Sequence, residues 1–155
     1  MKATDFLRKQ HRDVLSLLKK ALATDGGDRR ELVDQICESL KLHTMLEEQI
    51  FYPAYREAVG TKKGTDRVDE AYQEHHVVDL VLDELPRVDV EDDSFHARIT
   101  VLKELVEHHV EEEQEEMFPS AEKKLGKERL EELAEEMQAR MQHGDEAEAH
   151  GAAAH

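Results

Sequence analysis

The sequence predicts an all-α fold, an up-down-up-down four-helix bundle followed by a short extra helix, and two observations lead to this prediction. Charged residues make up 37% of the 155 residues, aromatic residues make up only 5%, and Trp is absent, a composition that favours long helices over sheets. Apolar residues also recur three and four positions apart along four long segments. Short polar connections join these segments, which is the pattern of antiparallel neighbouring helices in one domain.

The first two predicted helices cover residues 3–22 and 28–59. Thr4 or Asp5 is expected near the N-terminal cap of the first helix, which ends ahead of an Asp-Gly-Gly turn. The second helix ends at a glycine followed by a polar loop. Pro53 lies inside the second helix, and proline removes one backbone donor and strains the preceding turn. We therefore expect a kink or a break close to this proline rather than the end of the helix.

The third predicted helix covers residues 66–85 and follows a polar loop at residues 61–64. Pro86 closes this helix. Two adjacent histidines, His75 and His76, cannot both face the core. His75 is predicted to point inward, because the residues on its helix face are mainly apolar and those on the face of His76 are mainly polar or acidic. The companions of His75 are Val68, Ala71, Tyr72, Val78 and Leu82, and those of His76 include Asp69, Gln73, Asp79 and Asp83.

The fourth predicted helix covers residues 93–124, and of its adjacent histidines His109 is expected to face inward rather than His108. A weaker apolar pattern then predicts an accessory helix at residues 128–142, which either packs across the bundle or pairs with another chain. The small and polar residues at the C-terminal end predict disorder. The predicted division is a bundle, an accessory helix and a disordered tail, at residues 1–125, 126–143 and 144–155.

A repeated two-residue motif is the main functional signal in the sequence. His43 and Glu47 are four residues apart, so their side chains leave the same face of a helix one turn apart. Apolar residues share this face, which places an imidazole and a carboxylate in the core, where a bound cation would compensate their burial. His109 and Glu113 repeat the motif. In both copies an aromatic residue and a proline follow, and the proline lies ten residues after the histidine, as Tyr52-Pro53 and Phe118-Pro119.

Together with one inward histidine from each of the other two helices, the two motifs predict a buried metal centre. Four imidazoles and two carboxylates suit a pair of metal ions, with the carboxylates bridging and positions left open for a small ligand. Two iron ions fit this donor set best, and Mn or Zn remain alternatives because ligand type does not distinguish among them. The predicted ligands are His11, His43, Glu47, His75, His109 and Glu113.

The residues of this set and their surroundings resemble the hemerythrin-like (hemerythrin HHE cation-binding) domain family. The resemblance implies a four-helix bundle around a non-haem di-iron centre with an oxo or hydroxo bridge. It also implies that the centre binds or senses oxygen, nitric oxide or peroxide, and some members consume peroxide. Carried over by position, the six predicted residues would be the metal ligands. The segments that carry the resemblance are residues 9–11, 43–53, 74–75, 95–97 and 108–119.

The sequence departs from the oxygen-carrying hemerythrins at two positions. Asp79 stands where their third helix offers a second histidine, and Gln114 stands where their fourth helix places its carboxylate. These changes favour sensing or detoxification over reversible oxygen transport. Asp79 was considered as a replacement donor, and Tyr72 as a hydrogen-bond donor to a bound ligand. A peroxide-consuming enzyme and a metal storage protein are the alternative functions.

Charge and cysteine content bear on partners and location. Asp and Glu outnumber Lys and Arg by 37 to 21, and the net charge of -16 disfavours nucleic acid and anionic membranes as partners. The single cysteine, Cys37, permits no intramolecular disulfide and favours a reducing compartment. No leader or membrane-spanning segment is expected, so we predict a cytoplasmic location. The accessory helix is the predicted contact for a protein partner or a homodimer.

Overall fold

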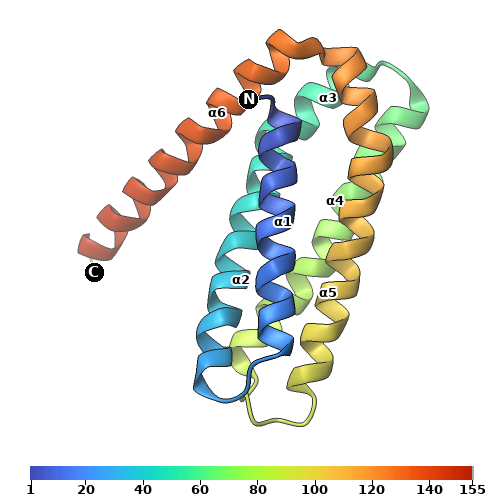
Figure 1. Ribbon diagram of the computed structural model, residues 1–155. Coiled ribbons are helices and arrows are strands. Elements are labelled where there is room, and N and C mark those ends of the chain that lie inside the picture. The colour runs from blue at the N-terminus through green and yellow to red at the C-terminus, as the bar shows by residue number, and fades with distance from the viewer. Residues whose placement is uncertain (155) are drawn as a thin grey trace.

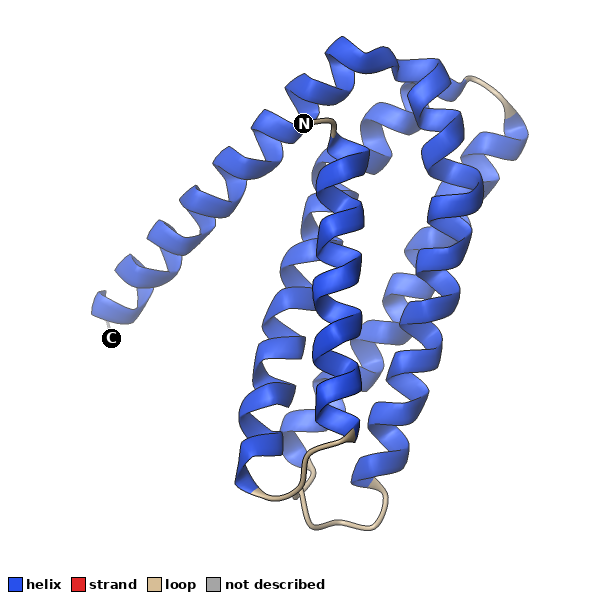
Figure 2. Ribbon diagram, in the orientation of Figure 1, coloured by secondary structure: helices blue, strands red, loops and turns tan. Residues whose placement is uncertain are grey.

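The computed structural model describes the backbone of residues 1–154 and the side chains of residues 1–143. Figures 1 and 2 show an assembly of helices, and no strand occurs in the part of the chain described. The predicted all-α bundle is confirmed. The main helices in chain order are α1 (Ala3–Leu22), α2 (Gly27–Leu46), α3 (Tyr52–Val59), α4 (Lys62–Glu84), α5 (Phe95–Glu112) and α6 (Phe118–Ala154).

Helices α1, α2, α4 and α5 form the four sides of the bundle (Figure 1). Helix α1 packs against α2 and α5, and α4 packs against the same two helices, which closes the ring. A 3₁₀ turn at Leu85–Arg87 ends the third side, in agreement with the predicted effect of Pro86. This arrangement directs one face of each helix toward a common axis.

Two π-helical turns interrupt the long helices, at Glu47–Phe51 and Glu113–Met117. In each of them the backbone N–H five residues ahead bonds to the carbonyl of the first residue, from Tyr52 to Glu47 and from Phe118 to Glu113. Each π turn is followed by a proline in the first turn of the next helix. The predicted irregularity near Pro53 is therefore present, and it takes the form of a widened turn that keeps the helix continuous.

The third helix begins at Lys62, four residues before the predicted start, because the expected loop is in fact its cap and first turn. The hydroxyl of Thr61 accepts a hydrogen bond from the N–H of Gly64 at 3.1 Å. A Cβ added at Gly64 would lie 2.4 Å from the Cγ2 atom of Val59, so this crossing requires glycine. The expected polar loop is thus a tight helix-to-helix connection.

The first turn of α1 contains both residues that were expected near the cap. Lys2 is the N-cap residue, and its N–H donates to the carboxylate of Asp5 at 3.2 Å. Thr4 is fully buried, and its hydroxyl donates to Glu122 at 3.0 Å. Asp5 therefore helps to cap the helix, and Thr4 links α1 to α6.

The accessory part of α6 packs across one end of the bundle. Gly126 has φ 80°, which turns the chain there, and the following segment passes the N-terminal end of α1 and then slants away from the bundle (Figure 1). Its apolar residues Leu130, Leu133 and Met137 are buried among side chains of the bundle. Of the two expected arrangements, the structure has the one in which this helix packs on its own chain. The predicted disordered tail lies outside the residues whose side chains are described.

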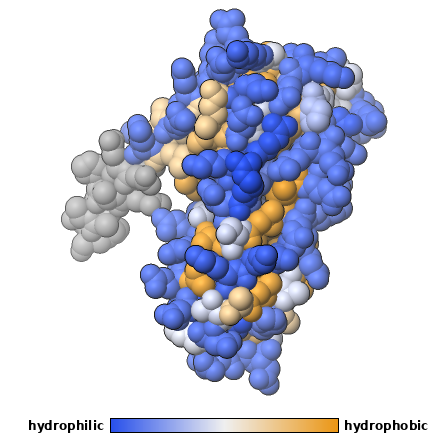
Figure 3. Space-filling view, in the orientation of Figure 1, coloured by the Kyte–Doolittle hydropathy of each residue, from blue (hydrophilic) through white to orange (hydrophobic). Residues whose placement is uncertain are grey.

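The apolar core has two parts, separated along the bundle axis. One part includes Leu7, Phe51 and the accessory helix, and the other includes Leu18, Ile36 and Ile99. The face in Figure 3 is mostly hydrophilic, with apolar side chains visible between the helices. Among the described residues, none of the helices combines the length and apolar character needed to cross a bilayer.

Candidate metal centre

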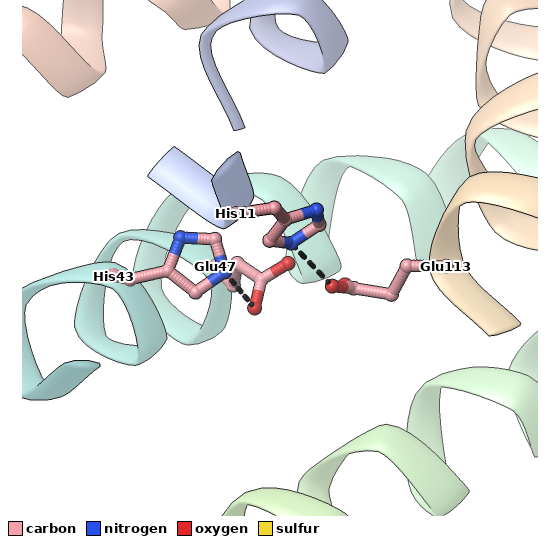
Figure 4. Close-up of side chains that lie close together, drawn as sticks. All are labelled: His11, His43, Glu47 and Glu113. Carbon is pink, nitrogen blue, oxygen red and sulfur yellow. Dashed lines mark hydrogen bonds and ion pairs between the residues drawn. The ribbon is translucent and has the colours of Figure 1, made fainter. Parts of the chain in front are cut away.

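The six predicted ligand residues all point into the interior of the bundle. They come from α1, α2, α4, α5 and the first residue of each π turn. Their neighbours His76 and His108 are exposed, so the predicted choice within each adjacent pair is confirmed. Figure 4 shows part of the group. The exposed fractions are His11 1%, His43 6%, Glu47 0%, His75 2%, His109 7% and Glu113 2%.

The four imidazoles form two pairs. The rings of His11 and His43 lie 4.8 Å apart between centroids, and those of His75 and His109 lie 4.7 Å apart. One pair comes from α1 and α2, and the other comes from α4 and α5. Each pair turns its Nε2 atoms toward the carboxylates in the middle, which is the orientation in which both rings of a pair can bind one cation.

Each carboxylate connects the two pairs. The Oε1 atom of Glu47 lies 3.1 Å from Nε2 of His43 and 3.1 Å from Nε2 of His75. The Oε1 atom of Glu113 lies 3.2 Å from Nε2 of His11 and 3.1 Å from Nε2 of His109. Every imidazole therefore faces a carboxylate oxygen that it shares with an imidazole of the other pair. Carboxylates in these positions could bridge cations bound by the two imidazole pairs.

A second layer of side chains faces the outer nitrogen of each imidazole. The Nδ1 atom of His43 lies 2.7 Å from Oε1 of Gln10, and the Nδ1 atom of His11 lies 2.9 Å from Oε1 of Gln114. These oxygens accept a hydrogen bond from Nδ1–H, which leaves the lone pair of Nε2 directed inward.

On the other side of the centre the outer partners are carboxylates. Glu74 accepts from Nδ1 of His109 at 2.8 Å, and Glu48 has an oxygen 3.5 Å from Nδ1 of His75. Such outer contacts fix ring orientation and tautomer in metal sites. Glu112, which lies on the same side of the bundle, instead pairs with the exposed His108 at 3.1 Å.

Tyr52 belongs to the centre, although the sequence pattern assigned it to the apolar core. Its side chain is fully buried, and its hydroxyl donates to Oε2 of Glu113 at 2.8 Å. The same hydroxyl lies 3.2 Å from Nε2 of His75 and 3.3 Å from Nε2 of His109. The one sequence signal for this role is the repeat itself, which has a hydroxyl-bearing aromatic residue in one copy and Phe118 in the other.

Two residues that the sequence suggested for the centre lie elsewhere. The hydroxyl of Tyr72 donates to the backbone carbonyl of Glu48 at 3.1 Å, so it is not directed at the site. Asp79 lines an outer groove together with Lys41 and Asp83, so it does not replace a missing imidazole. Both belong to α4, and both lie on its flank rather than on the face that carries His75.

The charges at the centre favour a bound cation. Burial alone would raise the pKa of Glu47, but the facing imidazole of His43 and surrounding hydrogen bonds hold it well below its usual value. Burial alone would lower the pKa of His109, but the carboxylate of Glu113 raises it well above its usual value. Glu47 is therefore held as an anion, which favours positive charge at the facing imidazoles, and a bound metal ion would supply that charge without protons.

Unsatisfied polar atoms give an independent test of the fit to metal. Within the described part of the chain, Nε2 of His43 and Oε2 of Glu47 are buried and have no hydrogen-bond partner. Leaving such atoms unpaired is costly, and both are ordinary donor atoms for a metal. In each of two buried groups, the possible ligand atoms lie within 4.8 Å of one another. One group is His11, His43, Glu47 and Glu113, and the other is Glu47, His75 and His109. The residues present therefore fit metal ions.

A small cavity of about 20 Å³ adjoins all four imidazoles. That volume is enough for a molecule about the size of water. The rest of its wall is mainly aliphatic, with one threonine, and consists of Val14, Leu40, Thr44, Val78, Val106 and Val110. The cavity is thus suited to a ligand of one or two heavy atoms that reaches the inner nitrogens from the apolar side.

Comparison with known proteins agrees with this geometry. A family model described as the Hemerythrin HHE cation binding domain matches residues 2–121. The fold is similar to the crystal structure of a Hemerythrin HHE cation binding domain-containing protein from Mycobacterium kansasii, with 28% sequence identity and a TM-score of 0.79. That match covers 92% of this chain and 86% of the other. No curated protein matches the sequence.

Proposed function

The chain belongs to the Hemerythrin HHE cation binding domain family, and from this premise we propose that it holds two iron ions and binds oxygen, nitric oxide or peroxide. The observation that carries the proposal is the crossed arrangement of Glu47 and Glu113 between two imidazole pairs. Six donors in this arrangement would offer two nitrogens to each of two ions, with the carboxylates between the imidazole pairs. The small cavity beside the imidazoles would leave space for the small ligand.

Iron is favoured because imidazole and carboxylate together suit an ion that changes between the divalent and trivalent states. When bound, such a pair supplies open coordination positions and electrons to a small ligand. Mn and Zn bind the same donor atoms, so the experiment below also determines which metal is bound.

The residues around the donors prepare this chemistry. The outer hydrogen bonds of His11, His43 and His109 hold their Nε2 lone pairs toward the centre, so that little reorganisation is needed when a metal binds. The aliphatic wall of the cavity limits water and leaves space for one small molecule. Tyr52 holds a proton 2.8 Å from Glu113, and its oxygen is a candidate seventh donor to the ion between His75 and His109.

The proposal is tested by the metal content and the absorption spectrum of purified protein. Two iron ions per chain and near-ultraviolet bands of a bridged ferric pair are expected, because Zn or an empty site produces no such bands. After reduction, addition of oxygen, nitric oxide or peroxide should change the spectrum. The variant His43→Ala should lose iron, whereas His76→Ala, a change of an exposed histidine, should retain it. Wild-type protein that binds no iron when supplied with Fe²⁺ would refute the proposal.

Peroxide consumption is a second candidate function, favoured by the position of Tyr52. Its hydroxyl proton lies inside the centre, where it could serve proton transfer during turnover. Sustained loss of peroxide, at many equivalents per chain, would indicate an enzyme. A single stoichiometric spectral change would indicate binding or sensing. Storage of a metal mineral is disfavoured, because the cavity of about 20 Å³ beside the imidazoles has no room for one.

A further inference from the structure

The centre is built from two equivalent halves of the chain. A polar residue precedes an inward histidine in both halves, as Gln10-His11 and Glu74-His75. The His-Glu motif then follows in both halves, with one further polar residue directly after the glutamate, as Glu47-Glu48 and Glu113-Gln114. The aromatic residue and the proline complete each copy. The two halves therefore supply the same kinds of residue in the same order.

The inner layer of the centre reproduces this equivalence in space. The four distances between inner nitrogens and the shared Oε1 atoms lie between 3.1 and 3.2 Å, and the two imidazole pairs have nearly equal spacing. These distances alone do not distinguish the two metal positions, although both carboxylates group with His11 and His43 whereas only Glu47 groups with His75 and His109. The residues behind the imidazoles and the aromatic residues distinguish the positions further.

The layer behind the imidazoles breaks the equivalence. Behind His11 and His43 the partners are the neutral amides of Gln114 and Gln10. Behind His109 the partner is the carboxylate of Glu74, at 2.8 Å from Nδ1. Nδ1 of His75 has no hydrogen-bond partner, and a carboxylate oxygen of Glu48 lies 3.5 Å from it. The two copies of the repeat thus differ in charge at two positions, where Gln10 corresponds to Glu74 and Gln114 corresponds to Glu48. At both positions the negative charge lies on the side of His75 and His109.

The aromatic residues of the two copies also differ, and the one with a hydroxyl lies on the side of His75 and His109. The ring of Tyr52 stacks on His75 with centroids 5.4 Å apart, and the ring of Phe118 stacks on His11 with centroids 5.7 Å apart. The phenol oxygen therefore lies beside the His75 and His109 pair, whereas the corresponding place on the other side holds only carbon. All three differences between the copies favour positive charge at one position.

We propose that the two metal positions differ in affinity, and that the position between His75 and His109 binds its ion first. A carboxylate that accepts a hydrogen bond from the outer imidazole nitrogen makes the inner nitrogen a stronger donor, and loss of such a partner typically weakens metal binding 10–100-fold. The neutral amides behind His11 and His43 orient these rings but do not strengthen the inner nitrogens in this way. The position between His11 and His43 would therefore hold its ion more weakly. This inference rests on the proposed two-metal site.

The test locates the first ion directly. Metal-free protein is loaded with one equivalent of Co²⁺ and crystallised, and anomalous diffraction at the cobalt edge shows which position is occupied. The expected peak lies between His75 and His109, with little at the other position. A variant that exchanges the outer layer should move the peak to the pair His11 and His43 while the total charge stays the same. That variant carries the substitutions Gln10→Glu, Gln114→Glu, Glu48→Gln and Glu74→Gln.

Solution titrations with Co²⁺ provide a measurement that does not depend on the fourfold variant. Glu74→Gln should weaken the tighter of the two binding steps 10–100-fold, and Glu111→Gln, the same change at an exposed position on α5, should leave both steps unchanged. Equal anomalous peaks in the wild-type protein, or a first peak between His11 and His43, would overturn the assignment although two ions bind. Absence of any bound ion would instead refute the metal site itself.

Discussion

The substitution Tyr52→Phe tests whether the buried phenol belongs to the metal centre. It removes one oxygen and preserves the ring, so the packing against neighbouring rings is retained. The lost contact is the hydrogen bond of 2.8 Å to Oε2 of Glu113, a charged and 2% exposed acceptor. Hydrogen bonds to charged groups contribute about 1.5–3 kcal/mol, and for a chain of this size 1 kcal/mol corresponds to roughly 2–4 °C in Tm. Metal-free protein should therefore melt about 6 °C lower.

The matched control is Tyr55→Phe, one turn further along the same helix. Tyr55 is also fully buried, but its hydroxyl donates to the neutral hydroxyl of Ser120 at 2.9 Å, remote from the centre. Its loss should cost about 1 kcal/mol, or roughly 3 °C, because neutral hydrogen bonds are weaker. Thermal melting of both variants by circular dichroism, with and without metal, provides the comparison.

The two variants should differ more strongly in metal binding than in stability. If the phenol oxygen is a donor, Tyr52→Phe should change the visible absorption of the iron-loaded protein and speed the loss of iron to a chelator. Tyr55→Phe should do neither. Equal effects of the two substitutions on melting, together with unchanged spectra and chelation rates, would show that Tyr52 only fills space.

Three further predictions concern protons and packing. Burial lowers the pKa of His109, but facing carboxylates raise it above its usual value, so stability of the metal-free protein should fall as pH rises above about 6.5; an increase in Tm over that range would contradict this. Gly64→Ala should lower Tm, because the new Cβ would lie 2.4 Å from Val59; an unchanged melting curve would show that the crossing relaxes freely. Met137→Ala should cost about 2–5 kcal/mol in urea unfolding if the accessory helix completes the core, and less than 1 kcal/mol would indicate a loosely attached helix.

The inner layer of the centre could be predicted from sequence because helical spacing alone determines it. His43 and Glu47 lie one turn apart on an apolar face, and an inward direction for their side chains follows from that face. The choice of His75 over His76 follows from the same argument. The start of α4 could not be predicted in this way, since it depends on the contact between Gly64 and Val59, two residues on different helices.

The outer layer could not be predicted because it depends on contacts between helices. Gln10 lies on α1 but serves His43 on α2, and Glu74 lies on α4 but serves His109 on α5. No spacing within one helix identifies such a pair. Asp79 lies four residues after His75 in the sequence, which suggests a second donor on the same face of α4. In the structure, however, Asp79 lines an outer groove.

Tyr52 was missed because the π turn changes the direction of every residue after it. In a regular helix of about 3.6 residues per turn, nine residues correspond to roughly two and a half turns, which would place Tyr52 opposite His43. The π turn at Glu47–Phe51 includes one extra residue, and this turns the following segment back by about 100°. The phenol then reaches the centre. The same turn at Glu113–Met117 brings Phe118 onto His11, so the irregular turns give each metal position its aromatic neighbour, and the hydroxyl of only one neighbour makes the two positions differ.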